Sequence, residues 1–236
     1  MEQSLEGYKV VAIPMLYMFR DGFEDKVREF VKNGGTAIMT YWSGIVDETD
    51  LCFLEGTPHG LMDVFGLRSM EIDALYDHEN NYIVSVNDSN IKISNQWKCK
   101  NLCDIINVST AKTLGVYGED FYKDSPVFTV NNYENGKAYY ICADFEQGFY
   151  DEAYAQIVQD AKVNLPIAMI TEGVEVTTRQ TEEYMYIFIQ NYNRKAVELN
   201  LDMEGKEILL GVYENNFIQP LTTIVVKSMI KDTVDA

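Results

Sequence analysis

The chain has 236 residues, of which 47% are hydrophobic and 24% charged, a composition typical of globular proteins and not of disordered ones. Its net charge of -18 argues against a nucleic acid partner, and the absence of basic runs argues against an anionic membrane surface. No apolar segment approaches the roughly 20 residues of a membrane span. Without a signal-peptide core at the N-terminus or a disulfide framework among the four cysteines, we expect a cytoplasmic protein.

The N-terminal third predicts an α/β fold. Residues 8–14 form a short apolar run that is typical of a buried parallel strand. A helical pattern follows, with Asp21 as the expected N-cap and Asn33-Gly34-Gly35 as the stop signal. Residues 36–41 are a second buried strand. A strand, a helix and a strand in this order make a right-handed crossover, so we expect a doubly wound, mostly parallel sheet.

The middle of the chain has a weaker pattern. Residues 70–108 are polar and irregular, with only short strand-like pieces. Asn135-Gly136 predicts a two-residue hairpin turn. After Gly148, apolar positions recur with helical spacing. The expected elements are a helix at 60–65, strands at 82–86, 105–107, 111–117, 127–131 and 137–143, and a helix from 150 to about 164.

A second domain begins near Leu165-Pro166, where the helical pattern disappears. Five short segments with polar turns between them indicate a small antiparallel β-sandwich. We therefore expect an α/β domain at 1–165 and a sandwich at 166–236. The five predicted strands lie at 174–179, 184–190, 197–201, 208–213 and 221–226.

Several stretches resemble bacterial β-galactosidases of glycoside hydrolase family 42, above all residues 41–53. The others are residues 7–18, 30–36, 136–141 and 173–179. The resemblance runs from about residue 5 to about residue 226 and concerns the middle and C-terminal domains of that family. It implies a middle domain that resembles class I glutamine amidotransferases, is flavodoxin-like and builds a trimer, followed by a small sandwich.

In that family an N-terminal barrel carries the two catalytic glutamates, and nothing in this sequence resembles the barrel. The first strand of the middle domain also has no counterpart. The resemblance therefore implies a fragment to which no catalytic residue of the family can be assigned. The expected role is to trimerise and to support a barrel that hydrolyses terminal β-galactosides with retention.

The aromatic loop, residues 40–53, follows the second strand, and ligands or partners often meet such sheets at strand ends. Its candidate residues are Tyr41, Trp42, Ser43 and Asp47. Aromatic rings stack on sugars, but they are also favoured anchors in interfaces. We favour burial or a subunit contact over direct sugar contact. The subunit contact and the sugar contact are compatible if, in a trimer, the loop lies at the edge of the catalytic cleft of a neighbouring subunit.

Three carboxylates of this loop, Asp47, Glu48 and Asp50, are close in sequence, and a glycosidase also uses a pair of carboxyl groups. A retaining pair needs about 5–5.5 Å across an enclosed sugar cleft. Three acids after a turn glycine in an acidic chain fit solvated or interface carboxylates better.

A second candidate segment, the apolar run, follows the first strand and consists of Met15, Leu16, Tyr17, Met18 and Phe19. Five large apolar side chains in a connection are unusual for a monomer surface. Either the run folds onto the core or it meets another subunit, and we favour the subunit contact.

Other chemistries have little support in the sequence. Cys52 and Cys142 lie in apolar runs, where we expect them to be buried and inert. The CxxxC spacing of Cys99 and Cys103 lacks a second ligand pair for zinc, and no phosphate-binding glycine motif occurs. We expect neither a metal nor a cofactor. The alternatives to a scaffold are an independent carbohydrate-binding module and, with less support, an amidotransferase-like enzyme.

Overall fold

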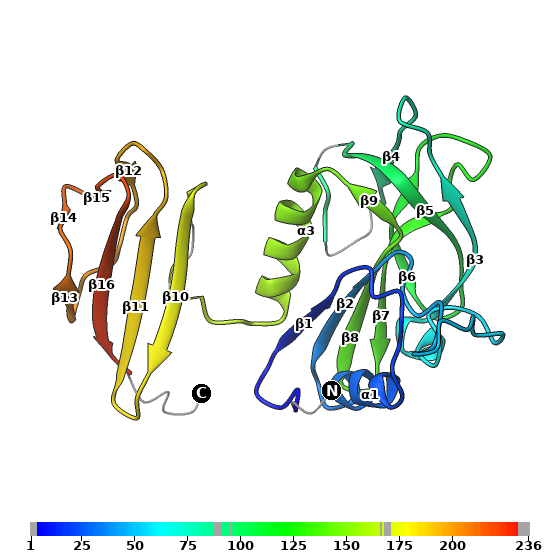
Figure 1. Ribbon diagram of the computed structural model, residues 1–236, viewed down its shortest axis with the longest axis horizontal. Helices are drawn as coiled ribbons and strands as arrows, with labels where there is room; N and C mark the ends of the chain where they lie inside the picture. Colours follow the sequence, from blue (N-terminus) through cyan, green and yellow to red (C-terminus); the bar gives the residue numbers. More distant parts are fainter. Residues whose placement is uncertain (1–3, 87–90, 95, 166, 168–170, 231–236) are drawn as a thin grey trace. The chain divides into compact units, whose positions relative to one another are not determined.

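The computed structural model describes residues 4–86, 91–94, 96–165, 167 and 171–230 (Figure 1). The chain forms two compact units, Met1–Val163 and Asn164–Ala236, and each is described by itself. Pro166, which the sequence places at the domain boundary, lies outside the described residues.

The predicted crossover at the N-terminus is confirmed. β1 (Val10–Ile13) and β2 (Thr36–Thr40) are parallel, and α1 (Phe23–Lys32) connects them. Every residue of β2 is buried. The predicted N-cap is wrong by one position, because Gly22 and not Asp21 precedes the helix, and Gly22 has a φ of 73° that glycine adopts without strain.

The first unit contains a nine-stranded mixed sheet in the order β1-β2-β8-β7-β6-β4-β5-β3, with β9 paired to β5. β8 is parallel to β2, and the pairings beyond β8 are antiparallel. The α/β class is confirmed, with its parallel part made by β1, β2 and β8. β6, β7 and β8 follow one another as antiparallel neighbours, whereas the β3–β5, β4–β6 and β5–β9 pairs join strands that are not consecutive in the chain. The remaining strands are β3 (Leu67–Ala74), β4 (Asn81–Ser85), β5 (Lys98–Val108), β6 (Lys112–Tyr117), β7 (Pro126–Tyr133), β8 (Gly136–Ile141) and β9 (Ala143–Phe145).

The prediction of an irregular segment at 70–108 is wrong. β3 and β5 pair in antiparallel register from Leu67 with Val108 to Ala74 with Leu102. Most side chains of β3 are exposed or half-buried, so the short alternation of apolar and polar residues over 70–74 does not mark a buried face. Its stability comes from pairing with a distant segment, which a local pattern does not reveal.

The predicted hairpin turn is displaced by one residue. Tyr133 pairs with Gly136, so the turn residues are Glu134 and Asn135, and Gly136 belongs to β8. Glycine at 136 has a different purpose, because a Cβ there would lie 2.1 Å from the carbonyl oxygen of Val31. The position permits close approach of α1 to β8.

Two further helices complete the first unit, α2 (Met62–Phe65) and α3 (Gln147–Asp160). α3 buries Phe149, Ala153 and Ile157 in the core, in agreement with the helical pattern predicted after Gly148.

The second unit is an antiparallel module, as predicted. One sheet has the order β10-β11-β16-β13 and the other β12-β15-β14. Its core takes side chains from both sheets, such as Ile189 and Ile218. The strand predicted at 208–213 is interrupted at Gly211, which has a φ of 82°. The strands are β10 (Val174–Gln180), β11 (Tyr184–Asn191), β12 (Val197–Glu198), β13 (Lys206–Leu210), β14 (Tyr213–Glu214), β15 (Phe217–Ile218) and β16 (Thr222–Met229).

Candidate functional site

The apolar run and the aromatic loop are joined by main-chain hydrogen bonds. We call the two joined segments the layer. Because β1 and β2 are parallel, both segments leave the sheet at the same edge. The N–H of Gly44 donates to the carbonyl of Leu16, and the N–H of Phe19 donates to the carbonyl of Val46, both at 2.9 Å. Two segments that the sequence singled out independently are therefore parts of one surface.

Ser43 joins the two segments from inside. Its hydroxyl is buried, donates to the carbonyl of Thr40 at 2.8 Å and accepts the N–H of Leu16 at 3.0 Å. The hydroxyl of Thr40 in turn accepts the N–H of Met15 at 2.7 Å. Beyond the ends of β1 and β2, the hydroxyls of Thr40 and Ser43 thus accept the main-chain N–H groups that no longer have a partner in the sheet. These hydrogen bonds fix the position of the layer.

Trp42 is anchored by a buried carboxylate that sequence reasoning missed. Asp104, on β5, is 1% exposed and accepts the N–H of Trp42 at 3.2 and 3.3 Å. The hydroxyl of Tyr140 donates to the same carboxylate at 2.7 Å. Burial raises the pKa of Asp104 to about 6, and the hydrogen bonds from Tyr140 and Trp42 oppose that rise. The sequence signal was a single acid inside the apolar stretch 102–106.

The aromatic rings of the site occupy two environments. Tyr41 is half-buried, and burial together with the nearby Asp144 raises its pKa to about 12. Tyr17 and Trp42 meet edge to face with ring centroids 5.4 Å apart. Partial desolvation and the carboxylate of Asp50 raise the pKa of Tyr17. The Tyr17–Trp42 pair is the partly exposed aromatic surface of the layer.

Asp47 closes the turn at the end of the loop. Its Oδ1 accepts the N–H of Thr49 at 2.8 Å, the hydroxyl of Thr49 at 2.7 Å and the N–H of Leu51 at 3.1 Å. Hydrogen bonds from Thr49 and Leu51 lower the pKa of Asp47. Glu48 and Asp50 lie exposed beside it. The arrangement is that of an Asx turn, in which the carboxylate serves the backbone.

The side chains of the apolar run divide between core and surface. Phe19 is 1% exposed and belongs to the core, whereas Met15 and Tyr17 are exposed. Leu16 and Met18 are half-buried and line a hollow of about 540 Å³. Its other lining residues are Arg20, Asp21, Gly22, Phe23 and Lys26.

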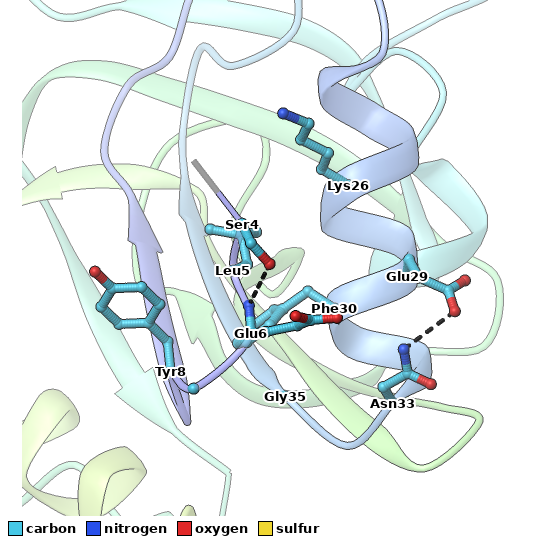
Figure 2. A pocket seen from close by; sticks show the side chains of 10 residues that line it. Ser4, Leu5, Glu6, Tyr8, Lys26, Glu29, Phe30, Asn33 and Gly35 are labelled. Atoms are coloured by element: carbon cyan, nitrogen blue, oxygen red, sulfur yellow. Dashed lines mark hydrogen bonds between the residues drawn. The ribbon is translucent and has the colours of Figure 1, made fainter. Parts of the chain in front are cut away.

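A second hollow, of about 560 Å³, lies between residues 4–8 and α1 (Figure 2). Figure 2 shows the hydrogen bonds from the Glu6 N–H to the Ser4 hydroxyl and from the Asn33 amide to Glu29, both 3.1 Å. The carboxylates that line it belong to exposed residues. A site that orients a small ligand usually has convergent, partly buried polar groups, so we assign no chemistry to this hollow.

The comparisons with known proteins agree with this geometry. The family model described as the β-galactosidase trimerisation domain matches residues 1–164, and the β-galactosidase C-terminal domain matches residues 173–214. The chain belongs to the β-galactosidases of glycoside hydrolase family 42. The resemblance predicted from residues 41–53 is thereby confirmed.

Individual relatives of the family align over most of the chain. It is 36% identical to β-galactosidase Pbg of Clostridium perfringens over 89% of its length, and 40% identical to BgaP of Planococcus sp. strain L4 over 88%. A solved β-galactosidase from Rahnella sp. R3 has a TM-score of 0.87 at 34% identity over 97% of the chain, and one from Bacillus circulans 0.88 at 32% over 96%. The chain spans about a third of the length of these family members.

The cysteines of this family member are mostly in the core. Cys99, Cys103 and Cys142 are buried, and burial raises the pKa of Cys142 well above its usual value. Cys52 is exposed, so the prediction that it is buried is wrong. It forms an antiparallel bridge with Val46 near the end of the aromatic loop.

Both histidines stack on aromatic rings. His59 stacks on Phe53 at a centroid distance of 3.6 Å, and His78 stacks on Tyr76 at 6.0 Å. Within the described ranges, no three His, Cys, Asp or Glu residues are grouped as metal ligands. The described helices include none that is long and apolar enough to cross a membrane.

Proposed function

We propose that this chain holds the subunits of a cytoplasmic β-galactosidase together as a homotrimer and supports its catalytic barrel. The whole enzyme would hydrolyse terminal β-galactosides with two glutamates outside this sequence. The family assignment supports the role, since the matched region is the one described as the trimerisation domain.

The observation that carries this proposal is the rigid layer at the ends of β1 and β2. It presents Met15 and Tyr17 to solvent while Ser43, Thr40 and Asp104 fix its backbone from below. Apolar and aromatic side chains on a fixed backbone are what association favours, because little conformational entropy is lost on contact.

The mass of the purified chain in solution tests this role. Light scattering after gel filtration should give three times the chain mass of 27.0 kDa. A mass of 27.0 kDa at every concentration up to about 100 μM, a range that covers weak specific association, would exclude self-association through this chain.

The acids of the aromatic loop support a non-catalytic role. Oδ1 of Asp47 accepts three hydrogen bonds of the turn, and Glu48 and Asp50 lie exposed. A retaining glycosidase needs one carboxyl group whose pKa is raised and one that is ionised, facing each other across a cleft. The exposed acids of this loop lack the enclosure that separates two such pKa values.

A second candidate, sugar binding, rests on the partly exposed Tyr17–Trp42 pair. Rings at strand ends can stack on a galactose, either in the isolated chain or as the edge of a neighbouring cleft. Isothermal titration of the chain with lactose separates these cases. Measurable heat that is lost in Trp42→Ala favours an independent binding module, and no heat favours the scaffold.

A further inference from the structure

The end of the aromatic loop is a fixed projection with apolar and acidic side chains. We define the acidic tip as residues 47–55. Leu54 is 95% exposed and Leu51 is 66% exposed, although both belong to a segment held by the Asp47 turn and by the Val46–Cys52 bridge. Two large apolar side chains held in water by an ordered turn are the mark of a contact surface.

The charge of the tip has one sign. Glu48, Asp50 and Glu55 are exposed, and none of the ion pairs among the described residues uses them. The tip therefore combines an apolar knob, Leu51 and Leu54, with three exposed acidic side chains that form no ion pair.

The apolar hollow beside α1 has the opposite character. Leu16, Met18 and Phe23 supply its apolar lining, and Arg20 and Lys26 also line it. Neither cation takes part in an ion pair within the described part of the chain. Lys26 projects from α1, as Figure 2 shows. Asp21 lines the hollow too, so its charged side chains carry one net positive charge.

Shape and charge of the two features are complementary. A hollow of about 540 Å³ lies within the range of about 300–1,000 Å³ that admits a small molecule, so it has room for an apolar side chain. Leu54 does not fill the hollow of its own copy, because it is almost fully exposed. Building on the proposed function, we infer that the acidic tip of one copy docks into the apolar hollow of the next copy.

Such a contact is head-to-tail, since two different patches of the same chain meet. Head-to-tail contacts generate rings when the rotation closes, and a trimer is one such ring. The tip and the hollow are joined through the same layer, because Met18 pairs with Val46 at the base of the tip. Both patches would thus lie near the axis of the ring.

A single substitution at Leu54 tests whether the apolar knob takes part in self-association. Leu54→Asp should weaken self-association at least about thirtyfold in sedimentation velocity, the ratio that corresponds to a hot-spot residue. Leu209→Asp is the matched control, because it adds the same charge at an exposed leucine of the second unit. An unchanged mass for Leu54→Asp, or an equal loss for both variants, would overturn the inference.

Charge reversal tests the pairing. Arg20→Glu with Lys26→Glu should weaken assembly about tenfold or more, as should Glu48→Lys with Glu55→Lys. All four changes in one chain restore opposite charges across a tip–hollow contact, so assembly should return. Failure to recover, with circular dichroism spectra that match the unmodified chain, would contradict the contact.

A mixing experiment distinguishes the geometry. A Leu54→Asp chain keeps its hollow and an Arg20→Glu/Lys26→Glu chain keeps its tip, so an equimolar mixture should form a 1:1 dimer and stop there. A mixture that stays monomeric would refute the head-to-tail contact. If the unmodified chain assembles while the mixture does not, only this inference fails; if the unmodified chain is a monomer, the proposed function fails with it.

Discussion

The main-chain N–H of Trp42 points at the buried carboxylate of Asp104, with N···O distances of 3.2 and 3.3 Å. Trp42 has a φ of 50°, a left-handed conformation that tryptophan rarely adopts. The contact with β5 compensates for that strain and sets the direction in which the aromatic loop leaves the sheet.

The first prediction concerns the pH dependence of this contact. The folded-state pKa of about 6 for Asp104 lies above its ordinary 3.8, so the folded protein binds the proton more tightly than the unfolded chain. The free energy of unfolding therefore falls by up to about 3 kcal/mol as the pH rises from about 4 to above 6. Asp104→Asn removes this pH dependence. In urea unfolding, the unmodified chain should lose more stability between pH 4 and pH 7 than the variant does; an equal change in both proteins would contradict the prediction.

A second variant at the same position tests the hydrogen bonds. Asp104→Leu leaves the hydroxyl of Tyr140 and the N–H of Trp42 buried without an acceptor. We expect a loss of roughly 2–6 kcal/mol in the free energy of unfolding, larger at pH 4 than at pH 7, because each orphaned group costs about 1–3 kcal/mol and the unmodified chain is more stable at the lower pH. A loss below about 0.5 kcal/mol, the size of an ordinary surface change, would show that the two donors find other partners.

Ser43→Ala should loosen the layer from inside. The N–H of Leu16 loses its acceptor, and the expected loss in the free energy of unfolding is about 1–3 kcal/mol. Ser109→Ala, at an exposed serine, is the control and should stay within about 0.5 kcal/mol. Equal melting temperatures for the two variants would remove Ser43 from its structural role.

Asp47→Ala should release the acidic tip. The turn loses three hydrogen bonds, so hydrogen exchange at the amides of Thr49 and Leu51 should accelerate while the strands keep their protection. The pKa of Asp47 is lowered in the fold, so its contribution is present at neutral pH and is lost as the pH falls through that lowered pKa. Glu48→Ala is the control and should leave the exchange rates unchanged.

Trp42→Ala tests the contact between this layer and a catalytic cleft. In a full-length relative with tryptophan at this position, we expect KM to rise about two- to tenfold with the trimer intact, the ratio that an aromatic contact carries. Steady-state kinetics and the solution mass give both readouts. An unchanged KM would leave Trp42 as a structural residue only.

The β1–α1–β2 crossover was predictable because its signals are local. β2 has an apolar centre between two threonines, and α1 has an apolar face that ends at a glycine pair. Gly136 shows the limit of such signals. Asn-Gly favours a hairpin turn, but in this fold the glycine serves the approach of β8 to the carbonyl of Val31. The tertiary contact moved the turn by one residue.

The sequence predicts which segments form the site, but it does not predict the tertiary contacts that join them. Aromatic and apolar residues at strand ends are visible in the sequence, and the structure joins them into one layer. Asp104 was missed because it lies 62 residues from Trp42, and only the register of β5 brings the two together. β3 and most of β5 were missed for a related reason, since their pairing joins segments that are not adjacent in the chain.

Hydrolysis of a nitrophenyl β-galactoside by the purified chain decides whether these residues are catalytic. We claim that they contribute contacts and shape and that the bond-breaking carboxyl groups lie elsewhere. We therefore expect nitrophenol to be released no faster than in buffer. Turnover by the chain alone, abolished when one of its own carboxylates is replaced by an amide, would contradict it.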